Sequence, residues 1–325
     1  MGEPSFKAIY GTFDKNMMPV LVDNVTEIIK RKFLKNGVVI IPVGTKLNHY
    51  FGDPVVGQRK FLCLDLGKSK HHIIEDNYTS DLRFDLNNPN KQIKLIYYLY
   101  MNRRSNWKKI ISGQLLQLKS YGLLDEAEVY VHITDPENIF DDVISTVHDL
   151  CKEAKISKST KNEYEYPGIK LVYDLATQDP GSVYIYLHAK GISRNVQSRI
   201  MEDLVVLPGT FENWRRKLEA FANKKINKMG LFPAVEGAQN KIDRGVRGGW
   251  IWFNFWYAKG SYLTSCEEPG LSANRFYYED WLGGPQNENS VKKGDCQSLH
   301  YGSDKKYFTA SQVYQELPAL AKKIN

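Results

Sequence analysis

The sequence lacks the features that mark membrane-spanning and secreted proteins. No uninterrupted apolar run approaches the roughly 18–20 residues that a membrane-spanning helix requires. The first residues, MGEPSFKAIYGTF, do not show the basic and then apolar order of a secretory signal. The sequence therefore predicts a soluble, cytoplasmic chain without a membrane span.

Cysteine is sparse, with four residues in a chain of 325. The four show neither CxxC pairs nor the Cys and His spacing of a zinc site, and they are too scattered to suggest a disulfide framework. We expect buried, free thiols at all four positions, which are Cys63, Cys151, Cys266 and Cys296.

Positive charge is in excess, and the excess is concentrated in one stretch. The formal net charge is +7, and between His188 and Lys259 there are 13 Lys and Arg against 6 Asp and Glu. A basic stretch of this kind suits a phosphate-bearing ligand. Alternatively, part of it forms the solvated side of a helix, namely Arg215, Arg216, Lys217, Lys224, Lys225 and Lys228.

Residues 1–86 differ in pattern from the rest of the chain. Short β-branched or alternating runs at 35–44 and 59–67 are punctuated by Gly and Pro, which is typical of strands. One helix is expected over 25–34. The polar stretch DLNNPNK, which follows, is expected to form a linker. We interpret residues 1–86 as a small β-rich accessory domain.

Residues 91–325 alternate between strand and helix patterns. Apolar runs at 93–101, 127–133 and 183–187 have strand length, and helical spacing follows Asn106 and Pro167. Strand–helix–strand units imply parallel strands with right-handed crossovers. The pattern predicts an α/β domain whose sheet is flanked by helices. Further helices are expected from Phe211 to near Gly230 and between 303 and 324.

Polar residues stand where two of the expected strands end. Ligands bind beyond the carboxyl ends of the strands in open α/β sheets, so Tyr100 and Asn102 are candidates after the first strand. His188 and Lys190, in HAKG, are two apart on an extended strand end and point to the same side. Together they could contact a diphosphate, although the same residues also fit an ordinary exposed strand end.

Two acidic residues stand among aromatic ones in RFYYEDW. Glu279 or Asp280 would be partly desolvated there, which suits a carboxylate to general-base catalysis; acids capping a surface helix are the alternative. Their adjacency argues against a glycosidase, because hydrolysis needs two carboxyl groups on opposite sides of the bond. In WIWFNFWYAKGSY most aromatics are expected in the core, and Asn254 and Lys259 are the polar exceptions.

The order of YYLYMNRRSNWKKIISGQLLQL, EYPGIKLVYDLA, YIYLHAKG, NWRRKLEAF, FNFWYAKGSYL and RFYYEDWLG resembles one protein family. It resembles GT-A glycosyltransferases from bacterial capsule and surface-polysaccharide clusters and from large DNA viruses. It is also similar to rhamnan-synthesis glycosyltransferases. The resemblance covers roughly residues 91–300. It implies a GT-A-like, Rossmann-like mixed sheet flanked by helices, and the host cytoplasm as location if the protein is viral.

The resemblance implies transfer of a hexose or pentose from a nucleoside diphosphate sugar, such as a UDP- or GDP-sugar, to a glycan or glycoprotein acceptor. Inversion at the anomeric carbon would use Asp280 or Glu279 as base. The donor-binding residues would be His188, Lys190, Asn102, Tyr100, Asn254 and Lys259.

The sequence departs from the family pattern at the metal-binding signature. HAKG occupies the place where GT-A enzymes usually carry Asp-x-Asp, so the resemblance implies no metal ligand and no required cofactor there. Lys190 could replace the cation there. We therefore expect weak or no metal dependence, although Mn²⁺ or Mg²⁺ stays possible through His300 and Asp280.

Two alternatives come from other functional classes. A catalytically silent glycan- or nucleotide-binding protein would bind a donor without turning it over. A nucleic-acid-binding protein would show affinity for polynucleotides that falls steeply with salt. No nucleic-acid-binding motif supports this last alternative, and we expect no nucleic-acid partner.

Overall fold

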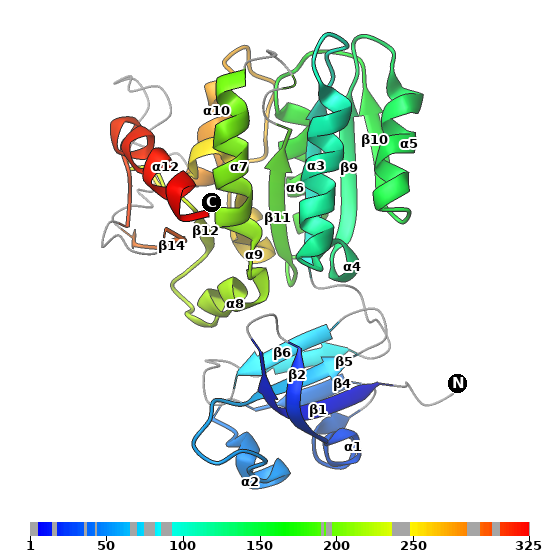
Figure 1. The fold of residues 1–325 in the computed structure, drawn as a ribbon, viewed down its shortest axis with the longest axis vertical. Coiled ribbons are helices and arrows are strands. Elements are labelled where there is room, and N and C mark those ends of the chain that lie inside the picture. Colours follow the sequence, from blue (N-terminus) through cyan, green and yellow to red (C-terminus); the bar gives the residue numbers. More distant parts are fainter. Residues whose placement is uncertain are drawn as a thin grey trace. The chain divides into compact units, whose positions relative to one another are not determined.

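The computed structural model describes residues 6–14, 18–35, 38–42, 44–65, 70–74, 82–85, 93–189, 192, 197–235, 248–284, 293–300 and 306–324. The chain divides into two compact units (Figure 1). The first comprises Met1–Lys91 with Arg215–Lys224, and the second comprises Gln92–Trp214 with Lys225–Asn325. The sequence pattern gave no sign that Arg215–Lys224 groups with the N-terminal residues.

The first unit is rich in β-structure. One antiparallel sheet has the order β2-β1-β5-β6, and another has the order β3-β4-β7. Helix α1 lies against the sheets with Ile29 and Phe33 buried, as its apolar spacing predicts. The elements are β1 (Lys7–Phe13), β2 (Pro19–Asn24), α1 (Thr26–Phe33), β3 (Leu34–Lys35), β4 (Val38–Ile41), α2 (Leu47–Phe51), β5 (Phe61–Asp65), β6 (Lys70–Ile74) and β7 (Leu82–Asp85).

The second unit is built on a seven-stranded sheet with the order β10-β9-β8-β11-β13-β12-β14. The sheet is mostly parallel, and β13 runs against its neighbours β11 and β12. The strands are β8 (Ile93–Tyr100), β9 (Glu128–Thr134), β10 (Lys155–Ser159), β11 (Val183–His188), β12 (Lys228–Gly230), β13 (Trp256–Lys259) and β14 (Cys296–Ser298). This mixed α/β architecture confirms the fold class expected from the alternating pattern.

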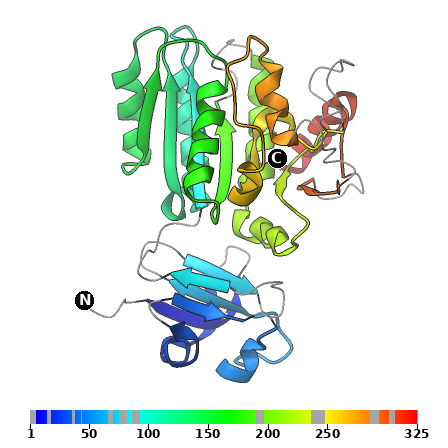
Figure 2. The ribbon, with the colours of Figure 1, turned by 180° about the vertical axis from the view of Figure 1, so that it is seen from behind.

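Helices cover both faces of this sheet (Figures 1 and 2). Helices α3 and α7 lie over one face, and α6 lies over the other, where its buried residues join those of α9 and α10 in one cluster. The helices are α3 (Trp107–Ser120), α4 (Leu123–Glu126), α5 (Phe140–Leu150), α6 (Tyr166–Gln178), α7 (Gln197–Phe211), α9 (Gly260–Leu263), α10 (Phe276–Asp280) and α12 (Ala310–Ile324), with short 3₁₀ turns η2 (Trp252–Asn254) and η3 (Trp281–Gly283).

The expectation of one helix from Phe211 to near Gly230 is wrong. Helix α7 ends at Phe211, and Asn213 adopts a left-handed backbone with φ 53°. The short helix α8 (Trp214–Leu218) and the turn η1 (Glu219–Ala222) follow. Asparagine tolerates the left-handed region better than most residues, so it can interrupt an otherwise helical apolar pattern.

Two further expectations are confirmed. All four cysteines are free and buried. Three of the clustered aromatics, Trp250, Phe255 and Trp256, lie in the core with at most 1% of their surface exposed.

Within the described part of the chain, no helix has the length and apolarity that crossing a membrane requires.

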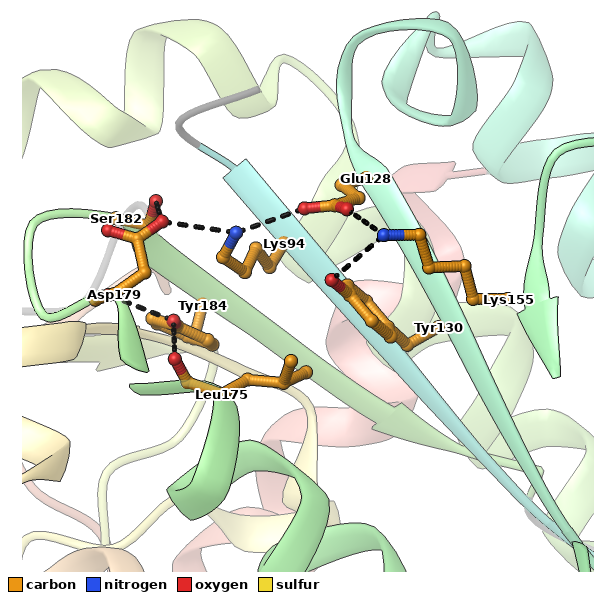
Figure 3. A network of polar contacts seen from close by, with 8 residues as sticks. All are labelled: Lys94, Glu128, Tyr130, Lys155, Leu175, Asp179, Ser182 and Tyr184. Atoms are coloured by element: carbon orange, nitrogen blue, oxygen red, sulfur yellow. Dashed lines mark hydrogen bonds and ion pairs between the residues drawn. The ribbon is translucent and has the colours of Figure 1, made fainter. Parts of the chain in front are cut away.

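A network of ion pairs and hydrogen bonds connects the amino ends of four parallel strands, β8, β9, β10 and β11 (Figure 3). The Nζ atom of Lys94 lies 3.0 Å from Oε2 of Glu128 and 3.1 Å from Oδ2 of Asp179. Lys155 pairs with the other oxygen of Glu128, and Ser182 donates a hydrogen bond of 2.6 Å to Asp179. Because β8, β9 and β11 all start here, this end of the sheet lies opposite their carboxyl ends.

Candidate functional site

The winding of the sheet reverses at β8, which defines the end at which a ligand is expected. The chain passes from β8 to β9 and β10 on one side, and then returns to β11 on the other side of β8. These four strands are parallel, so β8 and β11 end side by side, with His188 paired to Tyr98. Ligands bind outside the carboxyl ends of the strands at such a reversal. The candidate site therefore begins at Tyr100 and His188.

Asn102 shapes the turn that follows β8. Its Oδ1 atom accepts a hydrogen bond of 3.0 Å from the N–H of Arg104, and its carbonyl accepts one of 3.0 Å from the N–H of Ser105. Tyr100 is partly buried, and burial, with a smaller contribution from the charge of Glu137, raises its pKa. Both residues thus lie at the end of the sheet that their sequence position predicted.

His188 ends β11 with both ring nitrogens facing oxygen atoms. Nδ1 lies 3.1 Å from Oε1 of Glu165, and Nε2 lies 3.1 Å from the carbonyl oxygen of Phe253. The rings of Tyr186 and Phe255 pack against the imidazole, whose side chain is 13% exposed. His188 therefore ties the end of β11 to the segments that carry these two oxygens. Its expected partner Lys190 lies outside the described residues.

Glu165 is the residue that sequence reasoning missed. It directly precedes α6, and its side chain is 14% exposed. Beyond the contact with His188, its Oε2 atom accepts hydrogen bonds from the hydroxyl of Tyr186 at 3.1 Å and from Nδ2 of Asn254 at 2.8 Å. One carboxylate thus joins β11, α6 and the turn η2. Its only signal in the sequence is an acid placed just before a helix that has Pro167 in its first turn.

Asn254, a polar residue in an otherwise aromatic stretch, belongs to the cluster around Glu165. It is 2% exposed, and it follows Phe253 in a turn where both residues have left-handed backbones, with φ 55° and 71°. Its Nδ2 atom also donates to the carbonyl of Tyr278 at 3.4 Å. Its buried Oδ1 atom accepts no hydrogen bond from the described residues. A strained, buried polar turn of this kind is typical of functional sites.

The two acidic candidates lie in α10, which packs against η2. Asp280 is buried, with 7% of its surface exposed, whereas Glu279 is partly exposed. The carbonyl of Tyr278, which contacts Asn254, connects the helix to the cluster around Glu165. The structure therefore brings α10 to the side of the sheet where Glu165 and Asn254 lie. Of the two carboxyl groups, that of Asp280 is the desolvated one.

Lys259 does not belong to this cluster. It stands at the far end of β13, where it pairs with Val183, the first residue of β11, while Trp256 pairs with Tyr186 near the other end. Because β13 runs antiparallel to β11, the chain carries Lys259 away from His188, toward the amino ends of the parallel strands. Burial lowers the pKa of Lys259. Its expected grouping with the donor-binding residues is therefore corrected.

His300 follows β14 and packs between aromatic rings. It is 7% exposed, contacts the rings of Phe232 and Phe308, and lies 3.3 Å from a carboxylate oxygen of Glu316. The structure thus pairs His300 with a residue of α12. Among the described residues, no group of three or more His, Cys, Asp or Glu side chains is arranged to hold a metal ion.

Tyr98 connects β8 to the loop that leads to Glu165. Its hydroxyl donates to the carbonyl of Tyr164, and it lies 3.1 Å from Oγ1 of Thr134 at the end of β9. Tyr164, 41% exposed, has a left-handed backbone with φ 55°. Burial raises the pKa of Tyr98. This loop therefore lies at the carboxyl end of the sheet and is held there by a buried tyrosine.

The chain matches no protein-family model and no curated protein sequence. Among solved structures, it is similar to 4-diphosphocytidyl-2C-methyl-D-erythritol synthase, with a TM-score of 0.32 and 10% sequence identity. That similarity covers 70% of this chain and 99% of the other. A likeness at this level carries no conclusion about function.

Proposed function

We propose that the second unit is a glycosyltransferase that moves a sugar from a nucleoside diphosphate sugar to a glycan or glycoprotein acceptor. One observation carries the proposal: the winding reversal at β8 and β11 gathers Asn102, His188, Glu165 and Asn254 at one end of the sheet. This is where open α/β sheets bind nucleotides. The order of motifs that resembles GT-A glycosyltransferases supports the finer assignment.

Each group has a role in the proposed reaction. Asn102, which follows β8, faces the nucleotide and its diphosphate, and His188, whose ring nitrogens contact Glu165 and Phe253, holds the end of β11 beside them. Asp280 takes the proton of an acceptor hydroxyl, whose oxygen attacks the anomeric carbon as the bond to the diphosphate oxygen breaks. The nucleoside diphosphate leaves with the bonding electrons. Attack opposite the leaving group inverts the anomeric configuration. The buried position of Asp280 suits a base, because its carboxylate is shielded from water.

The side chains that the described residues place at this end do not fit Mn²⁺ or Mg²⁺. These ions prefer several oxygen ligands, and the carboxylate of Glu165 already contacts Tyr186, His188 and Asn254. HAKG supplies an imidazole and an amine where the GT-A glycosyltransferases that the sequence resembles usually carry Asp-x-Asp. We therefore propose that positively charged side chains stabilise the leaving diphosphate, and that transfer depends weakly or not at all on a metal.

Thermal unfolding with nucleotide sugars tests the proposal. UDP-glucose, GDP-mannose and dTDP-rhamnose would each be added with Mn²⁺ and with EDTA. A ligand at about 100 times its Kd stabilises the folded state by about 2.7 kcal/mol, which gives a clear shift in Tm. We expect one nucleotide class to stabilise the protein equally in both conditions. No shift with any of them would contradict the proposal.

A silent nucleotide- or glycan-binding protein is the second candidate. The observation that favours it is HAKG in place of the Asp-x-Asp signature. It predicts the same thermal shift without release of nucleoside diphosphate when acceptor glycans are added. Product release therefore separates the two candidates.

A further inference from the structure

Glu165 accepts contacts from three side chains that are distant in sequence from it. His188 and Tyr186 come from β11, and Asn254 comes from η2. The first contact uses Oε1, and the other two use Oε2. With 14% of its side chain exposed, Glu165 has exchanged most of its water for these donors. Contacts with His188, Tyr186 and Asn254 therefore fix the position of the Glu165 carboxylate.

The contacts of His188 indicate which of its ring nitrogens carry a hydrogen. Nδ1 faces a carboxylate oxygen and Nε2 faces a carbonyl oxygen, and both of these can only accept hydrogen bonds. A neutral imidazole carries one N–H, so its other nitrogen would set a lone pair against an oxygen. Both contacts are satisfied only when both nitrogens are protonated. The titratable groups that face the ring in the described contacts are Glu165, from the segment before α6, and Tyr186, from β11.

The contacts of Asn254 define the orientation of its amide. Nδ2 points at Oε2 of Glu165 and at the carbonyl of Tyr278, both of which are acceptors. The reverse orientation would place Oδ1 against these oxygens, so Oδ1 is the atom directed elsewhere. That atom is buried and accepts no hydrogen bond from the described residues. A buried acceptor needs a donor, and sugar hydroxyl groups supply donors at high density.

We infer that Glu165 is a positioning residue that keeps His188 protonated on both ring nitrogens and turns the Asn254 amide so that Oδ1 accepts a hydrogen bond from a hydroxyl of the donor sugar. The part that concerns the sugar rests on the proposed function. The part that concerns His188 rests on the geometry of the free protein alone.

Nitrogen NMR tests the part that concerns His188 without any ligand. Long-range proton–nitrogen spectra of the full chain, labelled with ¹⁵N-histidine at about pH 7.5, report the hydrogen on each ring nitrogen. His188→Gln assigns the signal among the seven histidines. We expect two protonated nitrogens in the wild type and one unprotonated nitrogen in Glu165→Gln. An unprotonated nitrogen in the wild type, or a Glu165→Gln spectrum that matches it, overturns the inference.

The matched control is Asp174→Asn, which removes an acid of α6 that is 45% exposed and pairs with Lys170. It should leave the His188 signals unchanged. If Glu165→Gln does not fold, the wild-type spectrum still decides whether both nitrogens are protonated.

Calorimetry with UDP-glucose, GDP-mannose and dTDP-rhamnose, each beside its parent nucleoside diphosphate, tests the part that concerns the sugar. We expect Glu165→Gln to weaken the binding of the nucleotide sugar about tenfold. Binding of its parent nucleoside diphosphate should weaken by less than about threefold. Equal losses overturn the role of Glu165 toward the sugar. A wild-type protein that binds none of them overturns the proposed function, whereas the NMR result still decides the state of His188.

Discussion

Lys94 and Glu128 form a cross-strand ion pair, with 3.0 Å between Nζ and Oε2, at the point where β8 and β9 begin. Lys94 is buried, with 7% of its side chain exposed, and Asp179 contacts it from the other side. Burial alone would lower its pKa, but the hydrogen bonds and charges of Glu128 and Asp179 outweigh burial and raise it. This charged cluster is distinct from the candidate site, which lies at the opposite end of the same strands.

Replacing Lys94 by methionine should destabilise the fold. The change removes the cation shared by Glu128 and Asp179 and leaves two partly buried acids close together. Removing one partner of a buried pair is strongly unfavourable, and we expect a loss of about 2–4 kcal/mol in the free energy of unfolding by urea. Lys170→Met is the control. Lys170 lies on α6, has 27% of its side chain exposed and pairs with the exposed acids Asp174 and Glu268, so its replacement should cost under about 1 kcal/mol. Equal losses would contradict the role given to Lys94.

The stability contributed by Glu128 should depend on pH. Burial would raise its pKa, but hydrogen bonds from Lys155 and Lys94 and the charge of Lys94 lower it to about 2. Because the folded-state pKa lies below the unfolded one, the contribution is present in full above about pH 5 and is lost as the pH falls toward 2. We expect Glu128→Gln to cost about 2 kcal/mol at neutral pH and progressively less in acid.

Urea unfolding between neutral pH and about pH 3 would measure this difference between the wild type and Glu128→Gln. Asp125→Asn, an exposed acid of α4, is the control. A gap between wild type and Glu128→Gln that stays constant over the range would show that the carboxylate charge is not what stabilises the pair.

Gly168 should tolerate no side chain. A Cβ atom there would lie 2.9 Å from the hydroxyl oxygen of Tyr186 and 2.9 Å from Cβ of Tyr98. Gly168→Ala should cost about 1–3 kcal/mol by overpacking, and it should weaken nucleotide-sugar binding because the start of α6 carries Glu165. Gly113→Ala, where a Cβ meets nothing within 4 Å, should instead stabilise α3 by about 0.5–1 kcal/mol. Thermal unfolding and calorimetry measure both effects.

Much of the second unit could be predicted from the sequence. Strand β8 is buried on both faces, and its continuous apolar run signals this directly. Helix α6 begins where Pro167 indicates, and β11 ends at the polar residues of HAKG. Local composition and period define such elements, so the ends of β8 and β11 could be placed at one edge before the structure was known.

The cluster around Glu165 could not be predicted in the same way. Its partners His188 and Asn254 are contacts between segments far apart in the chain, and no local pattern encodes them. The error with Lys259 has a related cause. It is close to Asn254 in sequence, but the direction of β13 places it at the opposite end of the sheet. Strand direction depends on the tertiary fold, which periodicity does not report.

The release of nucleoside diphosphate from a nucleotide sugar, in the presence of a panel of acceptor glycans, tests the central claim most directly. We expect the wild type to release it, and Asp280→Asn to do so at least about 100-fold more slowly while still binding the donor. Glu268→Gln, an exposed acid paired with Lys170, should behave as the wild type. No release by the wild type from a donor that it binds, or equal release by Asp280→Asn, would contradict the account.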